Sequence, residues 1–256
     1  MNLLFLAETV ASDPFKDLAP PLQVALLLGA LSFATAALVS LTAFTRIIIV
    51  LSFVRRALST TEIPPNQVML GLAFFLTLFV MAPTFEKINN NAIQPYLKAQ
   101  AAADKATESA ESLGVIESAE SAGVAKNDEA TFGLRELFEN SAFEIRQFIT
   151  VHTRVSDIEL FVALSNEPEP ESIDAIPMIV LIPAFIISEL KTAFIMGFCI
   201  YIPFLLIDLV VSTALMSLGM MMMPPVIVST PCKLLLFVLV DGWQLISKSL
   251  VGSFVV

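Results

Sequence analysis

The sequence has one histidine and two cysteines among 256 residues, and this scarcity excludes several classes of protein. The single histidine, His152, rules out a zinc-protease motif, which needs two histidines on one helix. Cys199 and Cys232 lie in apolar segments, where a thiol is usually a small buried hydrophobic group. A phosphate-binding glycine loop is absent as well, which argues against nucleotide hydrolysis. We therefore expect no catalytic centre, no metal site and no cofactor, and take His152 as an ordinary surface or interface residue.

Charge is also scarce. Charged residues make up 15% of the chain and hydrophobic residues 56%, and the mean hydropathy is +0.81. This composition is typical of membrane proteins. The apolar residues gather in four regions, at 19–54, 63–85, 175–207 and 209–256. Because roughly 20 apolar residues cross a bilayer as a helix, the sequence predicts an all-α, membrane-class protein built of long, kinked helical hairpins.

The net charge of −10 lies in one internal region. Residues 86–174 hold 17 acidic and 7 basic side chains, and the rest of the chain holds 7 of each. Arg55 and Arg56 sit in the short loop between the first two apolar segments, so the positive-inside rule places that loop in the cytoplasm. The acidic region then falls on the outer, periplasmic side of the membrane. Without a basic face, nucleic acid is not expected as a partner.

These patterns predict four parts: a leader or tail at 1–18, a helical hairpin at 19–85, the acidic region at 86–174, and helical hairpins at 175–256. The first helix is expected from Pro20-Pro21 towards Arg55, and the second from about Pro65 to Pro83. Apolar residues three and four apart predict an amphipathic helix over 132–149, followed by a short helix near 157–164. The Ala-, Ser- and Glu-rich stretch 99–130 is expected to be disordered or loosely helical. Within 175–256 we expect one pair of arms at 175–207 and 209–223, and another over 226–256.

Four methionines, Met220–Met223, lie between Gly219 and Pro224. Proline has no backbone N–H and disfavours helix at the preceding residue, so a helix should break here. Methionine is long, flexible and polarizable, and adapts its shape to what it touches. The run indicates a soft apolar collar around something that moves. Plain packing remains open, and so does Cu(I) ligation with Cys199 or Cys232, although adjacent residues cannot all face one ion.

Six charged residues lie within or beside apolar segments: Arg46, Glu189, Lys191, Asp208, Lys233 and Asp241. A lone charge facing lipid costs on the order of several kcal/mol. These groups therefore pair with one another, line a wet path, or belong to helices that are not in lipid. Glu189 with Lys233, or Asp208 with Lys233, would allow pairing within or between subunits. A proton relay and an intramembrane aspartyl pair are the rival interpretations.

Several blocks of sequence carry a resemblance to a known family. They are 44–50 (FTRIIIV), 64–73 (PPNQVMLGLA), 188–194 (SELKTAF), 201–208 (YIPFLLID), 219–225 (GMMMMPP) and 233–243 (KLLLFVLVDGW). In these blocks the chain resembles the FliP family of flagellar type III export-gate proteins and its virulence-secretion relatives. The resemblance covers residues 30–98 and 132–250.

The resemblance implies a subunit that assembles in several copies, with FliQ and FliR, into a helical, closed gate in the inner membrane at the flagellar basal body. FlhA and FlhB would dock beneath it, and unfolded flagellar substrates would pass through. The apolar helices would be lifted largely out of the bilayer, which would explain their charges. The pore gasket maps onto Met220, Met221 and Met222, and the inter-subunit ion pair onto Glu189 and Lys233. The long acidic 99–130 insertion and the atypical leader depart from the family pattern.

Two other functions remain open from the residues. An ion-coupled secondary transporter or channel would use Glu189 and Asp208, and it predicts solute flux through this chain alone. A membrane scaffold would recruit a partner through the acidic region, and deletion of 99–130 tests it. The export-gate interpretation predicts no enzymatic activity and no solute flux without FliQ and FliR.

Overall fold

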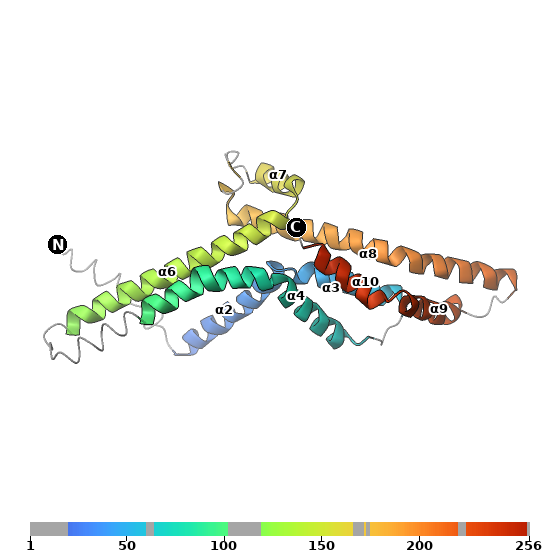
Figure 1. Ribbon diagram of the computed structural model, residues 1–256, viewed down its shortest axis with the longest axis horizontal. Coiled ribbons are helices and arrows are strands. Elements are labelled where there is room, and N and C mark those ends of the chain that lie inside the picture. Colours follow the sequence, from blue (N-terminus) through green and yellow to red (C-terminus); the bar gives the residue numbers. More distant parts are fainter. Residues whose placement is uncertain are drawn as a thin grey trace. The chain divides into compact units, whose positions relative to one another are not determined.

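The computed structural model describes residues 20–59, 64–101, 119–165, 172, 175–219 and 224–254. Within these ranges the regular secondary structure is helical, which confirms the all-α, membrane-class prediction. The helices are α2 (Pro20–Ser40), α3 (Phe44–Ala57), α4 (Asn66–Ile88), the π-helical turn η1 (Asn89–Ile93), α6 (Ala119–His152), α7 (Val155–Leu164), α8 (Met178–Ser217), α9 (Pro225–Leu239) and α10 (Gly242–Gly252) (Figure 1).

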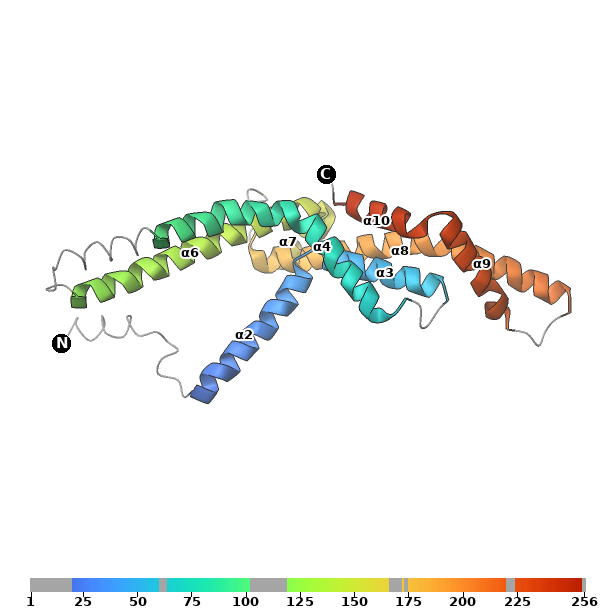
Figure 2. The ribbon, with the colours of Figure 1, turned by 60° about the horizontal axis from the view of Figure 1, so that its bottom comes forward.

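The chain forms two compact units, each described separately. One comprises Met1–Leu38 with Thr84–Ile145. In it, α6 runs alongside the helical residues that follow α4 (Figure 1 and Figure 2). Asn91, in η1, donates from Nδ2 to Oε1 of the buried Glu144 on α6 at 2.7 Å. The Nδ2 of Asn140 donates to the Asn91 carbonyl at 3.4 Å, so α6 supplies polar partners to the π turn.

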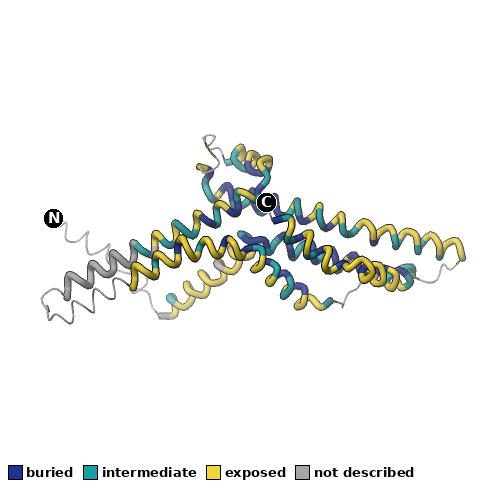
Figure 3. Tube along the Cα trace, viewed as in Figure 1, coloured by how far each residue is buried: buried dark blue, intermediate teal, exposed yellow. Residues whose placement is uncertain are grey.

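The second unit comprises Val39–Pro83 with Arg146–Val256, and its core lies between α3 and α8. One face of α3 is buried, and the first half of α8 carries most of that helix's buried residues (Figure 3). Gly197 explains how closely the two helices approach, because a Cβ there would lie 2.5 Å from the Phe53 ring. The ring of Phe53 also meets the Phe194 ring edge-on, with centroids 5.6 Å apart. The side chains of this interface therefore hold α3 and α8 in one register.

Proline ends fewer helices than the sequence predicted. The expected arms at 175–207 and 209–223 are wrong, because α8 is a single 40-residue helix that passes through Pro183 and Pro203. The expected end near Pro83 is also wrong, since the helix that begins at Asn66 runs to Ala101. An internal proline removes one backbone hydrogen bond and strains one carbonyl. In these long apolar helices, the helical turns on either side of the proline contribute more stability than the one lost hydrogen bond removes.

The first apolar region breaks where no proline or glycine marks it. We expected one helix towards Arg55, but α2 ends at Ser40 and α3 begins at Phe44. Two threonines lie at the break. The Phe44 N–H donates to the Thr42 hydroxyl at 3.4 Å, and the Thr45 hydroxyl donates to the Val39 carbonyl at 3.0 Å. Hydroxyl groups that bond nearby backbone atoms compete with regular helix, which accounts for the break.

Three described helical stretches are long and apolar enough to cross a membrane, at Pro21–Ser40, Asn66–Ala101 and Met178–Ser217. Counting α9 and α10 as one span, bent by 63°, makes four. These lengths support a membrane-embedded protein.

The helices predicted in the acidic region are present as α6 and α7. Their apolar face is only partly covered, since Phe148 and Ile149 are buried but Phe138 is exposed. Residues 119–130 belong to α6, and 99–101 are helical as well. The remainder of the 99–130 insertion, and the leader or tail at 1–18, lie outside the described residues.

Candidate functional site

Arg46 and Glu189 form a sealed ion pair between α3 and α8. The Arg46 side chain is 4% exposed and that of Glu189 is 0% exposed. The Nε of Arg46 donates to Oε2 of Glu189 at 2.7 Å, and its Nη2 donates to Oε1. Such a two-pronged contact satisfies both charges at once. This pairing explains why α3 can carry a charged arginine on its buried face.

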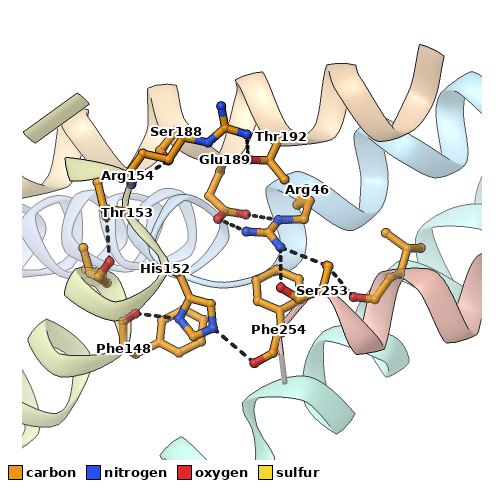
Figure 4. Close-up of polar contacts among 12 residues, drawn as sticks. Arg46, Phe148, His152, Thr153, Arg154, Ser188, Glu189, Thr192, Ser253 and Phe254 are labelled. Atoms are coloured by element: carbon orange, nitrogen blue, oxygen red, sulfur yellow. Dashed lines mark hydrogen bonds and ion pairs between the residues drawn. The ribbon is translucent and has the colours of Figure 1, made fainter. Parts of the chain in front are cut away.

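The same guanidinium also holds the turn after α10. Nη1 of Arg46 donates to the Ser253 carbonyl at 3.1 Å and to the Ser253 hydroxyl at 2.9 Å (Figure 4). Its central carbon lies 3.8 Å from the centroid of the Phe254 ring, a distance suited to a cation–π contact. Arg46 therefore joins residues 143 and 207 positions away in the sequence.

Next to this pair, the turn between α6 and α7 bonds to α8. The Arg154 backbone N–H donates to the Ser188 hydroxyl at 3.0 Å. The Arg154 Nη2 donates to the Thr192 hydroxyl at 3.1 Å. Figure 4 shows these contacts on the side of α8 above Glu189. The charged cluster thus ties α3, α8, the α6–α7 turn and the turn after α10 together.

A second buried charge lies on α9. The Lys233 side chain is 2% exposed, and its Nζ donates to Asp208 Oδ2 on α8 at 2.6 Å. It also donates to the Ser59 hydroxyl at 2.6 Å. Ser59 has a positive φ of 54°, in the left-handed region that a serine rarely adopts. The Asp208 side chain is 34% exposed, but its Oδ1 is buried and has no hydrogen-bond partner within the described residues.

The six charged residues singled out from the sequence therefore fall into two groups, one in ion pairs between helices and one at the surface of the single chain. Arg46, Glu189, Asp208 and Lys233 form the two ion pairs. Lys191 and Asp241 are exposed in the single chain, and their burial in an assembled gate stays a prediction. Lys191 points towards Asp157 with Nζ and Oδ1 4.0 Å apart, and Asp241 occupies the left-handed turn between α9 and α10.

The predicted pair of Glu189 with Lys233 involves two subunits, so it stays a prediction. Within one chain each has a different partner: Arg46 for Glu189 and Asp208 for Lys233. Pairing of Asp208 with Lys233 was the alternative left open by the sequence. An aspartyl pair of Asp208 and Asp241 finds no support, because the Asp208 carboxylate binds Lys233.

Met220–Met223 lie outside the described residues, but the structure describes both flanks. Helix α8 ends at Ser217, Gly219 has a φ of +76°, and Pro224 is extended with α9 beginning at Pro225. The predicted helix break is therefore confirmed. The two helices pack on each other, with the Phe204 and Phe237 rings 6.3 Å apart. The methionine run thus connects the two arms of a helical pair.

The thiols differ from the expectation. Cys199 and Cys232 are both exposed in the single chain, on α8 and α9. No group of three or more His, Cys, Asp or Glu residues suited to a metal occurs in the described ranges. The copper alternative would need the methionines that lie outside those ranges.

Sequence reasoning missed the small polar and aromatic residues around the charges: Ser59, Ser188, Thr192, Ser253 and Phe254. Their types are common and their spacing carries no pattern. His152 was taken as an ordinary residue, yet it is half-buried against Phe254, with ring centroids 5.3 Å apart. One signal was available: Arg46 on an apolar helix required an acidic partner elsewhere in the chain.

Long apolar helices that bury ion pairs between them define an all-α protein of the membrane class. The chain belongs to the FliP family, whose model matches residues 27–250. It is 46% identical over 244 residues to the flagellar biosynthetic protein FliP of Bacillus subtilis (strain 168), covering 95% of this chain and 96% of that protein. The Pectobacterium carotovorum FliP is 46% identical, covering 99% of this chain and 91% of its own length. The Aquifex aeolicus (strain VF5) FliP is 38% identical, with 93% and 87% covered.

Proposed function

We propose that this chain is a core subunit of the flagellar type III protein export gate. Several copies, together with FliQ and FliR, form the pore through which unfolded flagellar substrates leave the cytoplasm, and FlhB and FlhA dock beneath. Its role is transport rather than catalysis. Membership of the FliP family supports the flagellar assignment. The acidic region at 86–174 lies on the periplasmic side of the inner membrane in this proposal.

The observation that carries the proposal is the surface of α8 and α9. Their charged residues are paired inside the chain, while large apolar side chains stay exposed on both helices. They include Phe198, Ile202, Leu205, Leu206, Leu209 and Val210 on α8, and Val226, Ile227, Leu235, Val238 and Leu239 on α9. Exposed apolar patches of this extent mark a surface that meets lipid or another chain. Copies that meet through this surface would bring their methionine runs together.

In the ring, Met220, Met221 and Met222 act as the gasket. Each chain supplies one segment of a deformable apolar collar, and the helix ends at Ser217 and Pro225 fix where that segment starts and stops. Flexible thioether side chains close around a passing polypeptide of changing shape. Apolar side chains also leave ions without hydrogen-bonding partners, which limits leakage.

The gasket is tested by replacing Met220, Met221 and Met222 together with alanine. The variant complex should assemble with FliQ and FliR but leak ions or small molecules, because alanine is too short to fill the collar. Ion flux into vesicles that hold the purified complex measures this. Met216→Ala, an exposed methionine within α8, is the matched control and should stay tight. An assembled triple variant as tight as the unaltered protein would remove the gasket from the proposal.

The inter-subunit pair is tested by two charge swaps. If Glu189 and Lys233 pair between copies, Lys233→Glu should prevent assembly and added Glu189→Lys should restore it in part. If the contacts within one chain dominate, Glu189→Lys places a second cation beside Arg46 and gives no rescue. The swap of Asp208→Lys with Lys233→Asp should then rescue instead. Size-exclusion chromatography of the purified complexes distinguishes these outcomes.

The ion-coupled transporter keeps one supporting observation, the partly exposed Asp208 side chain within an apolar helix, whose Oδ1 has no hydrogen-bond partner within the described residues. Liposomes that contain this chain alone separate the two functions. Solute or proton flux that Asp208→Asn abolishes would favour the transporter. The export gate predicts no flux without FliQ and FliR.

A further inference from the structure

The His152 ring lies between two carbonyl oxygens. Its Nδ1 is 2.8 Å from the Phe148 carbonyl, one turn earlier in α6. Its Nε2 is 3.3 Å from the Phe254 carbonyl, in the turn after α10 (Figure 4). A neutral imidazole carries one N–H and the protonated ring carries two. Only the protonated ring donates to both oxygens, whereas a neutral ring turns a nitrogen lone pair towards one of them.

The turn at Ser253 and Phe254 has few other polar attachments. Arg46 donates to Ser253, and its guanidinium covers the Phe254 ring. The Phe148 and Phe254 rings are stacked, with centroids 6.4 Å apart and 15° between the planes. The contact from His152 is the polar one that joins this turn to α6. Loss or gain of this hydrogen bond would therefore affect the C-terminal end of α10.

The charges around the ring come from every neighbouring element. Glu189 on α8 interacts electrostatically with the ring, and its own charge is matched by Arg46 on α3. Arg154, in the turn after α6, opposes protonation, but its guanidinium bonds to Thr192 on the far side of Glu189 from the ring (Figure 4). Asp157 on α7 and Lys191 on α8 have opposite charges and offset each other. The two carbonyl oxygens are therefore the nearest groups that distinguish the two forms of the ring.

We propose that His152 is a proton-dependent latch, which fastens the Ser253–Phe254 turn to α6 when protonated and loosens it when neutral. Histidine changes charge between about pH 5 and 8, the range in which such a latch would operate. The turn is held more firmly at acidic pH, and the extra hold is lost as the pH rises. The latch lies within one unit of one chain, so it does not depend on the export-gate proposal.

Amide hydrogen exchange on the full chain in detergent micelles tests the latch. Protection of residues 248–254 is measured at pH 5.5 and pH 8 and corrected for the intrinsic exchange rate. We expect about fivefold higher protection at pH 5.5, the effect of gaining one hydrogen bond. Residues 229–237 of α9 serve as the internal reference, which should show no such difference. Because His152 is the only histidine in the sequence, His152→Gln removes every imidazole from the chain.

In His152→Gln, the side-chain amide bonds equally at both pH values, so the protection ratio should fall to about one. His152→Asn repeats the test with a shorter amide, should Gln unsettle α6. An unaltered chain equally protected at both pH values would overturn the latch. A pH dependence that persists in both variants would also overturn it and assign the effect to Glu189, which keeps its carboxylate in them.

Discussion

The Arg46–Glu189 and Asp208–Lys233 ion pairs differ in how completely they are closed. Glu189 is fully buried and meets Arg46 through two hydrogen bonds, and the other end of Arg46 is held by Ser253. Asp208 is a third exposed, and Lys233 meets only one of its oxygens. The first pair lies in the core between α3 and α8. The second lies where α8 and α9 expose apolar side chains.

This difference separates a structural centre from a site that is open to neighbours. A buried charge that loses its partner has no access to water and strongly destabilises the fold. A partly exposed carboxylate is hydrated when its partner is removed, so the cost is smaller. The closed pair should therefore determine whether the chain folds. The open pair should contribute less to the folding of the single chain.

Arg46→Leu should have the largest effect on the isolated chain. It leaves Glu189 buried without a partner, at a cost of about 3–5 kcal/mol in unfolding free energy. Thermal unfolding in detergent should show a lower midpoint or no folded protein. Lys191→Leu, an exposed charge on the same helix as Glu189, is the matched control and should change little. Equal effects of the two substitutions would mean that the closed pair is not structural.

Lys233→Met should cost less in the isolated chain, about 1–3 kcal/mol, because the Asp208 side chain is a third exposed and a small rotation brings its carboxylate to water. In the complex with FliQ and FliR the loss should be greater, since neighbouring chains would exclude that water. The same unfolding measurement on the chain and on the complex tests both statements. A larger loss for Lys233→Met than for Arg46→Leu in the isolated chain would reverse the comparison of the two pairs.

Gly197→Ala should widen the α3–α8 interface that carries the closed pair. The added Cβ would lie 2.5 Å from the Phe53 ring, and overpacking of this kind costs about 1–3 kcal/mol. Gly71→Ala in α4 is the matched control, because nothing lies within 4 Å of its added Cβ. There alanine should stabilise the helix by up to about 1 kcal/mol. If the thermal unfolding midpoints of Gly197→Ala and Gly71→Ala shifted in the same direction, that result would argue against close α3–α8 packing.

The smallest effect is expected at two left-handed residues, Asp241 and Ser59, with φ of 50° and 54°. Glycine relieves backbone strain at either position, so Asp241→Gly should stabilise the chain by about 1 kcal/mol or less. Ser59→Gly relieves the same strain but loses the hydroxyl that accepts from Lys233. Its unfolding midpoint should therefore lie below that of Asp241→Gly. Equal midpoints would show that the Ser59 hydroxyl contributes nothing to the open pair.

Sequence reasoning succeeded where the signal is local. The spacing of apolar residues located α6 and α7, and the glycine and prolines around Met220–Met223 located the end of α8 and the start of α9. It failed at Pro83 and Pro203, where the rule that proline ends a helix predicted a break but the helix continues. It also missed the break between Ser40 and Phe44, where threonine hydroxyls rather than proline interrupt the helix.

The charge clusters show the same limit. An arginine on an apolar helix predicts that an acidic partner exists, but several carboxylates in the sequence qualify. Glu189 became the partner of Arg46 because α3 and the first half of α8 pack face to face. His152 gained its environment in the same way, from a turn about 100 residues later. Such pairings depend on which helix faces meet, and a single sequence does not contain that information.

By itself the sequence determined the membrane class, the helical nature of the chain and the break at the methionine run, because composition, periodicity and proline act over a few residues. Only the tertiary structure decided which charge meets which, and therefore which pair is closed and which is open. A buried ion pair joins residues far apart in the chain, and its energy depends on the burial that packing creates.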